Sequence, residues 1–222
     1  MCSVLIIANT SAAAVYVNVW HVPNGGGHGD DNALFKAISI PANTSIVWNK
    51  GNIQQVPTDT VVAGRLLLFT PQCSEPPATN FATLDLRNYH PVLDFSPTTN
   101  ESTVFGGVMP PTYRGNGVTV YLHYAMTSAE ANTVDWDVAF ERIGDQQLDI
   151  DGDSFAAVQS VDNTTVPGTA GLVDVVTIAF TDGAQMGGIL AGESFRIKVT
   201  RDAVNDDATG DAELLMVEIK ET

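Results

Sequence analysis

Apolar residues in this chain occur in short segments bounded by glycine, proline, asparagine, aspartate or serine. Within several segments apolar and polar residues alternate, which is typical of strands that have one buried and one solvated face. The clearest segment spans residues 118–124, whose apolar face holds Val118, Val120, Leu122 and Tyr124. Residues 194–201 alternate in the same way. The pattern therefore predicts an all-β protein built from antiparallel sheets.

The predicted strands fall into two groups separated by a proline-rich stretch at residues 71–80. The first group comprises residues 4–8, 15–20, 34–40, 45–48 and 65–69, with a hairpin connection at 41–44. The second group comprises residues 83–86, 92–95, 103–109, 118–124, 135–141, 173–180, 194–201 and 215–219, or about eight or nine strands in all. We therefore expect a small N-terminal β-sandwich over residues 1–72 and a larger jelly-roll-like sandwich over residues 73–222.

Two strands of the second group allow a prediction of which residues are buried. In 135–141 the alternation buries Trp136, Val138 and Phe140 and exposes the acidic residues between them. In the last strand Leu215, Val217 and Ile219 form the inner face.

Charge is distributed unevenly between the two groups. Residues 1–80 hold 4 acidic and 3 basic residues, whereas residues 81–222 hold 22 and 7, so the second part carries −15 of the net −16. This balance argues against nucleic-acid partners, which require a basic stripe, and against anionic membranes. No apolar run approaches the roughly 20 residues that span a bilayer, and no basic residue precedes the first apolar run. We expect a soluble chain without an export signal.

The cysteine content is too low for a disulfide framework. Cys2 and Cys73 are the only cysteines, and neither belongs to a C-x-x-C motif. Unpaired thiols in a reducing cytoplasm are the favoured interpretation, with a bridge between the two as the alternative.

The best candidate for a metal site is the run that contains Asp149, Asp151 and Asp153, because alternate carboxylates can converge on a calcium ion. The EF-hand pattern fails, since Ser154 and Ser160 stand where Gly and Glu are needed. A solvated acidic loop without any metal is the favoured interpretation, and calcium is the alternative. A second acidic loop, at residues 202–211, is interpreted in the same way.

The sequence contains no recognisable catalytic motif. Its four histidines share no metal-ligand spacing, and His28, in a glycine-rich loop, is only a weak candidate for a partner-facing residue. Neither a P-loop nor a nucleophile elbow is present. A glycosidase pair of Asp137 and Glu141 would lie about 13 Å apart along one strand, too far for hydrolysis. The sequence therefore predicts a protein that is not an enzyme and has no cofactor.

Aromatic residues offer a possible binding surface in the first group. Tyr16 and Trp20 share the face of their strand that lies opposite the valines. If the valines face the core, these two side chains face a partner or a glycan; otherwise they form a second buried face.

Four segments, at residues 81–95, 118–124, 134–142 and 195–202, resemble in style the jelly-roll proteins of tailed-bacteriophage virions, of the head-decoration (cement) or fibre type. The resemblance covers about residues 75–222. It implies a non-enzymatic homo-oligomer, most often a trimer, that docks on the major capsid protein or another virion protein. It would be assembled in the host cytoplasm and remain in the virion.

The leading hypothesis is accordingly a phage protein that decorates and stabilises the capsid, docking through the nearly uncharged residues 1–80. The alternative is a phage fibre or carbohydrate-binding β-sandwich that recognises a glycan on the host surface. A glycosidase or lyase ranks third.

Overall fold

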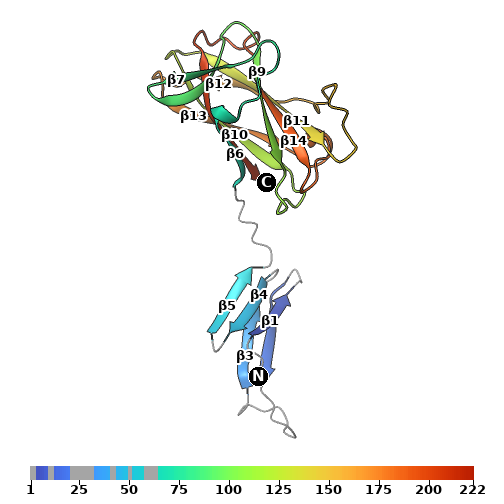
Figure 1. Cartoon of the computed structure of the whole chain (residues 1–222). Coiled ribbons are helices and arrows are strands. Elements are labelled where there is room, and N and C mark those ends of the chain that lie inside the picture. Colours follow the sequence, from blue (N-terminus) through green and yellow to red (C-terminus); the bar gives the residue numbers. More distant parts are fainter. Residues whose placement is uncertain (1–3, 10–12, 21–32, 41–43, 50–51, 58–64) are drawn as a thin grey trace. The chain divides into compact units, whose positions relative to one another are not determined.

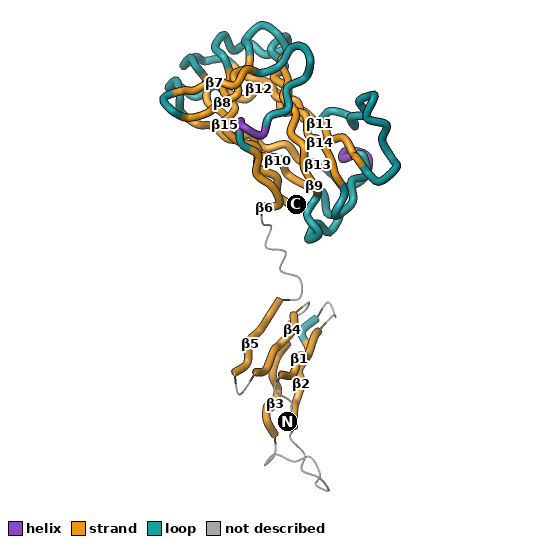
Figure 2. Tube along the Cα trace, in the orientation of Figure 1, coloured by secondary structure: helices purple, strands orange, loops and turns teal. Residues whose placement is uncertain are grey.

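The computed structural model describes residues 4–9, 13–20, 33–40, 44–49, 52–57 and 65–222. The chain divides into two compact units, Met1–Val62 and Ala63–Thr222. Strands dominate both units, and helix over the described ranges is limited to two short 3-10 turns, η2 (Pro71–Cys73) and η3 (Ala184–Met186) (Figures 1 and 2). The expected all-β class is confirmed. Neither of these helical turns has the length or apolar character needed to cross a membrane.

The described part of the first unit forms two small antiparallel sheets. Its strands are β1 (Val4–Asn9), β2 (Val15–Trp20), β3 (Ala33–Ile40), β4 (Thr44–Asn49) and β5 (Asn52–Pro57). One sheet has the order β1-β4-β5 and the other consists of β2 and β3. The expected hairpin between residues 34–40 and 45–48 is wrong, because β3 and β4 belong to different sheets.

The second unit consists of a six-stranded and a four-stranded sheet (Figure 1). Its strands are β6 (Arg65–Phe69), β7 (Thr83–Arg87), β8 (His90–Phe95), β9 (Glu101–Val108), β10 (Val118–Met126), β11 (Thr133–Ile143), β12 (Gln159–Thr165), β13 (Val173–Phe180), β14 (Ser194–Arg201) and β15 (Ala212–Glu221). The larger sheet has the order β13-β10-β15-β8-β7, with β6 also pairing β15, and the smaller has the order β12-β11-β14-β9. All of these pairings are antiparallel, as expected for a sandwich.

The boundary between the units differs from the predicted one. Strand β6, assigned from the sequence to the first module, pairs with β15, placing Phe69 opposite Val217. Phe69 is buried and stacks on Phe105 with ring centroids 5.4 Å apart. The break therefore falls between Val62 and Ala63 rather than after residue 72, because β6 buries its apolar face in the second core.

The core of the second unit lies between its two sheets. Val118, Val120, Leu122 and Tyr124 are fully buried, as their alternation predicts. Trp136 is also fully buried, and Phe95 and Tyr124 meet it edge-on with centroids 5.2 and 5.4 Å away. Edge-to-face contacts of this kind add to the stabilisation from area burial alone.

A bulge changes the inner face of the last strand. The ladder between β10 and β15 shifts so that His123 pairs with Met216 while Tyr124 pairs with Leu214. Leu214 is buried in the core and Leu215 is only partly buried. The predicted inner position of Leu215 is therefore wrong, because an extra residue in one strand reverses the facing of the residues on either side of it.

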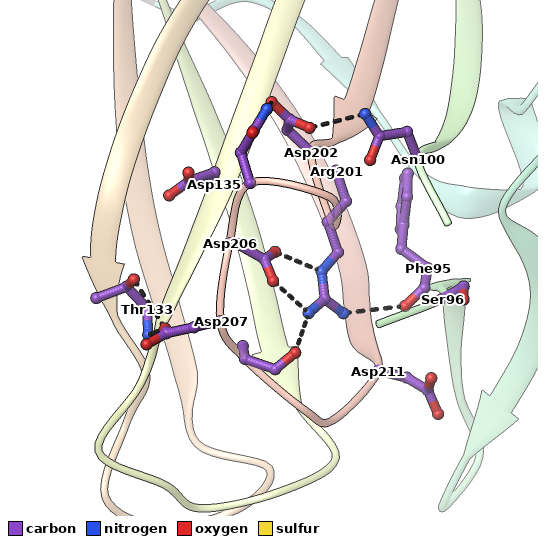
Figure 3. A network of polar contacts seen from close by, with 12 residues as sticks. Phe95, Ser96, Asn100, Thr133, Asp135, Arg201, Asp202, Asp206, Asp207 and Asp211 are labelled. Carbon is purple, nitrogen blue, oxygen red and sulfur yellow. Dashed lines mark hydrogen bonds and ion pairs between the residues drawn. The ribbon is translucent and has the colours of Figure 1, made fainter. Parts of the chain in front are cut away.

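The second acidic loop, residues 202–211, is held on the sandwich by a buried arginine (Figure 3). The side chain of Arg201 is fully buried, and its Nε donates a hydrogen bond to the Asp206 carboxylate at 2.8 Å. Its remaining nitrogens donate to Asp206 and to the backbone carbonyls of Phe95, Ala208 and Gly210. The expectation of a solvated loop is wrong for Asp206, which pairs with the buried Arg201 guanidinium, whereas Asp207 is exposed as expected.

Asp94 on β8 gives the fold a predicted pH dependence. Burial raises the pKa of Asp94 to about 6, and the nearby carboxylates, with Asp211 and Glu213 foremost, contribute to that rise. Because the folded pKa exceeds the ordinary value of 3.8, the contribution of Asp94 to stability is greatest at low pH and falls as the pH rises through 6.

Asp94→Asn should therefore stabilise the fold by about 1 kcal/mol at pH 7.5, a value reduced for partial solvent exposure, and much less at pH 4. Thermal melts of both proteins across this range measure the difference. Asp145→Asn, in an exposed turn, serves as the control. A gain from Asp94→Asn that is the same at both pH values would contradict this account.

Candidate functional site

A groove of about 500 Å³ opens on the second unit over the outward face of the four-stranded sheet. Ser102 and Val104 of β9 and Arg196 and Lys198 of β14 contribute to its floor. Lys198 pairs with Val104 in the ladder, so the two strands run side by side beneath the groove. The alternation of β14 that buries Ile197 turns Arg196 and Lys198 outward.

One wall is the segment 75–80, which runs along the edge of β9. The Glu75 N–H donates to the Val104 carbonyl at 2.8 Å, and the Ser102 N–H donates to the Asn80 carbonyl at 2.8 Å. Pro76 and Pro77, between these two anchors, have fixed φ angles and limit the freedom of the segment. This wall is therefore held in place by backbone hydrogen bonds.

The opposite wall is the loop after β11 that carries Asp153 and Phe155. The Ala156 N–H donates to the Phe140 carbonyl at 2.8 Å, and the Ser154 N–H donates to the Glu141 carboxylate at 2.5 Å. Glu141 is completely buried beneath the loop. Its buried carboxylate thus anchors the loop that forms the wall.

The prediction that the acids of residues 135–141 are exposed is wrong for Glu141 and Asp135, which are both buried. The Asn163 N–H donates to Asp135 at 2.6 Å. Period-two alternation assigns these carboxylates to the outer face, but neighbouring loops and strands cover that face.

Asp137 and Glu141, weighed above as a glycosidase pair, both have protein partners. The Ser160 hydroxyl donates to Asp137 at 2.5 Å, and Arg196 Nε donates to Glu141 at 2.5 Å. Burial raises the pKa of Asp137, while the hydrogen bond from Ser160 opposes that rise. Both carboxylates serve the structure of the sheet.

The floor of the groove brings two cations to one aromatic ring. Arg196 Cζ lies 5.2 Å and Lys198 Nζ 4.6 Å from the centroid of Phe155. Arg196 also donates Nη2 to Asp153 at 2.7 Å. Burial lowers the pKa of Arg196, but its hydrogen bonds to Asp153 and Glu141 raise it above the usual value, so the guanidinium stays charged.

Of the three carboxylates suggested for calcium, Asp153 alone reaches the groove, through its ion pair with Arg196. Asp149 instead accepts a hydrogen bond from the Asp151 N–H at 3.1 Å within its own loop. The three do not form a metal-holding group, and no cluster of three or more His, Cys, Asp or Glu suited to a metal occurs among the described residues.

The other suggested site residues belong to the first unit. Tyr16 on β2 is 73% exposed, which suits a partner-facing residue. Trp20 ends the same strand, but its side chain lies outside the description, as does the whole of His28. Cys73 is exposed and free, whereas Cys2 lies outside the described residues.

Sequence reasoning missed the groove residues Phe155, Arg196 and Lys198. The alternation of residues 194–201 already placed the two cations on one wet face, in a chain with only 10 basic residues. That pairing was the available signal. Phe155 gave none, since it lies in the loop between β11 and β12 without an alternating pattern around it.

No protein-family model and no curated protein matches this chain. Among solved structures it is similar to a family 35 carbohydrate-binding module from an environmental isolate, at 12% identity and a TM-score of 0.42, covering 69% of this chain and 91% of that one. The xylan-binding module CBM15 matches at 9% identity and a TM-score of 0.37, covering 72% and 98%.

The insecticidal delta-endotoxin Cry8Ea1 from Bacillus thuringiensis matches at 12% identity and a TM-score of 0.40, covering 82% of this chain and 30% of the toxin. Such distant likenesses concern the arrangement of strands alone.

Proposed function

We propose that this protein is a non-catalytic β-sandwich module that binds a glycan in the groove over the four-stranded sheet. The observation that carries the proposal is an open, largely polar groove that also presents one aromatic side chain, Phe155. A sugar ring has an apolar face that packs on an aromatic ring and a rim of hydroxyls that need hydrogen-bond partners.

The groove supplies such partners of both kinds. Glu75 and Asp153 offer carboxylate oxygens, while Arg196 Nη1 and Lys198 Nζ offer donors that no acceptor in the described part of the chain occupies. Hydrogen bonds that involve a charged group are stronger than those between neutral groups. This set of groups therefore suits a polyhydroxylated ligand.

The groove is also organised in advance of binding. Arg196 is held between Glu141 and Asp153, and backbone hydrogen bonds fix segment 75–80 and the loop around Ala156. Groups that are already ordered lose little conformational entropy when a ligand binds. A non-catalytic role fits because Asp137 and Glu141 are occupied by Ser160 and Arg196.

The test is a glycan array probed with the full chain, followed by calorimetry on the best ligand. Phe155→Ala should weaken its binding about tenfold, because stacking on the ring contributes about 1–1.5 kcal/mol. Tyr89→Ala removes a 92% exposed aromatic from the hairpin between β7 and β8 on the other sheet, and should leave affinity unchanged. Absence of binding to any glycan, or a loss caused by Tyr89→Ala instead, would overturn the proposal.

Capsid decoration, a homotrimer and a capsid-protein partner remain predictions from the sequence resemblance, and no described feature favours them over glycan binding. A virion fibre that binds a host glycan would satisfy both interpretations.

A further inference from the structure

We propose that the ligand of this groove is an anionic saccharide, and that Lys198 binds its carboxylate or sulfate group. This inference rests on the proposed glycan-binding function and specifies the class of glycan. It starts from an imbalance in the charges of the second unit, where acidic residues outnumber basic ones by 22 to 7 over residues 81–222.

In so acidic a segment, a basic side chain would be expected to have a carboxylate partner, and most do. The ion pairs are Arg87–Glu213, Arg142–Glu193, Arg196–Glu141, Arg201–Asp206 and Lys220–Glu218. Lys198 differs, because over the described ranges no carboxylate lies within ion-pair distance of its ammonium, and its contact is the Phe155 ring. Lys198 lies close enough to Asp137 to oppose the rise in the pKa of that carboxyl, but among the described residues it forms no ion pair on the floor of the groove.

Lys220 on the other sheet provides an internal comparison. Its Nζ lies 4.0 Å from the centroid of Tyr121, much as Lys198 lies over Phe155. There, however, Glu218 completes the arrangement at 3.1 Å from the Lys220 ammonium. The same cation–π contact thus occurs at Lys220 with a carboxylate at ion-pair distance and at Lys198, in the groove, without one.

The position of Arg196 adds to the argument. Its guanidinium and the Lys198 ammonium approach the same ring, at 5.2 and 4.6 Å, so two like charges are held near one another. Glu141 and Asp153 offset the charge of Arg196 through their ion pairs, but neither lies within ion-pair distance of the Lys198 ammonium. Arg196 Nε and Nη2 are occupied by Glu141 and Asp153, while Nη1 has no acceptor among the residues that the structure describes. An anionic group on the ligand would pair with Lys198 and accept from Arg196 Nη1.

The carboxylates on the two walls of the groove restrict where an anionic group of the ligand can lie. Glu75 stands on one wall and Asp153, with its side chain 72% exposed, on the other. Carboxylates accept hydrogen bonds from sugar hydroxyls but repel a second anionic group. The groove therefore favours a saccharide whose anionic group reaches the floor while its hydroxyls face the walls.

The experiment measures binding of the full chain to matched pairs of glycans. A xylotriose that carries one glucuronic acid is compared with its methyl ester, and a monosulfated galactobiose with its desulfated form, beside neutral xylan and mannan oligosaccharides. The expected result is at least tenfold tighter binding of one anionic member than of its neutral or desulfated counterpart. The first pair responds to a carboxylate and the second to a sulfate.

Lys198→Gln should remove that preference and leave affinity for the methyl ester or desulfated form within about twofold. Lys220→Gln is the matched control and should change neither affinity. If the chain binds neutral glycans best, or if Lys198→Gln leaves the preference intact, the inference is overturned while the proposed function stands. If no glycan of any class binds, the proposed function fails together with the inference.

Discussion

Arg201→Ala is expected to lower the free energy of unfolding by about 3–5 kcal/mol, the range for breaking a buried ion pair by removing one partner. Asp206, whose side chain is as fully buried as that of Arg201, would be left charged and without its partner. The carbonyls of Phe95, Ala208 and Gly210 would each lose a donor (Figure 3). Urea-induced unfolding followed by tryptophan fluorescence measures the loss.

Arg142→Ala is the matched control for this prediction. Arg142 also forms a two-contact pair, with Glu193, but both side chains retain solvent contact. A surface ion pair of this kind contributes about 0–1 kcal/mol. Equal losses for the two variants would show that burial of the Arg201 network does not govern its contribution.

Glu141→Ala is expected to destabilise the second unit by about 2–3 kcal/mol and to weaken glycan binding at the same time. The change removes the acceptor of Arg196 Nε and of the Ser154 N–H, both beneath the groove wall. Hydrogen bonds to a charged group contribute about 1.5–3 kcal/mol each, and the contribution is at the lower end here because Ser154 and Arg196 are partly in solvent. The loop that carries Phe155 should then detach from the sheet, and Arg196 should lose its fixed position.

Hydrogen exchange of the Ser154 and Ala156 amides, together with calorimetry on the array ligand, measures both effects. Glu193→Ala breaks the surface pair with Arg142 and the hydrogen bond from the Leu190 N–H, and it should change neither, because none of these residues lines the groove. Unaltered amide protection and unaltered affinity in Glu141→Ala would show that the loop is held by other contacts.

Strands could be predicted from the sequence wherever one face is buried and the other faces solvent, as in β10 and β14. The prediction failed where tertiary context determines what a residue contacts. Strand β6 follows the first module in sequence yet completes the second sandwich. Strand β12 was missed because, as an edge strand with mostly polar residues, it has little apolar alternation.

The groove itself was beyond sequence reasoning because its parts are far apart along the chain. Glu75, Ser102, Asp153 and Lys198 meet only when β9 and β14 pair and two loops cover their outer face. The burial of Glu141 could not be predicted either, since a carboxylate on the outward face of a strand is normally solvated. The sequence did indicate that Arg196 and Lys198 share one face, but not that Phe155 lies above them.

The most direct test of glycan binding in this groove is an NMR titration of the full chain with the tightest array ligand. The account predicts amide shifts centred on Ser102, Phe155 and Lys198, on the outward face of the four-stranded sheet. Shifts centred on Tyr16 in the first unit, or on Tyr89 of the other sheet, with the groove amides unchanged, would contradict it.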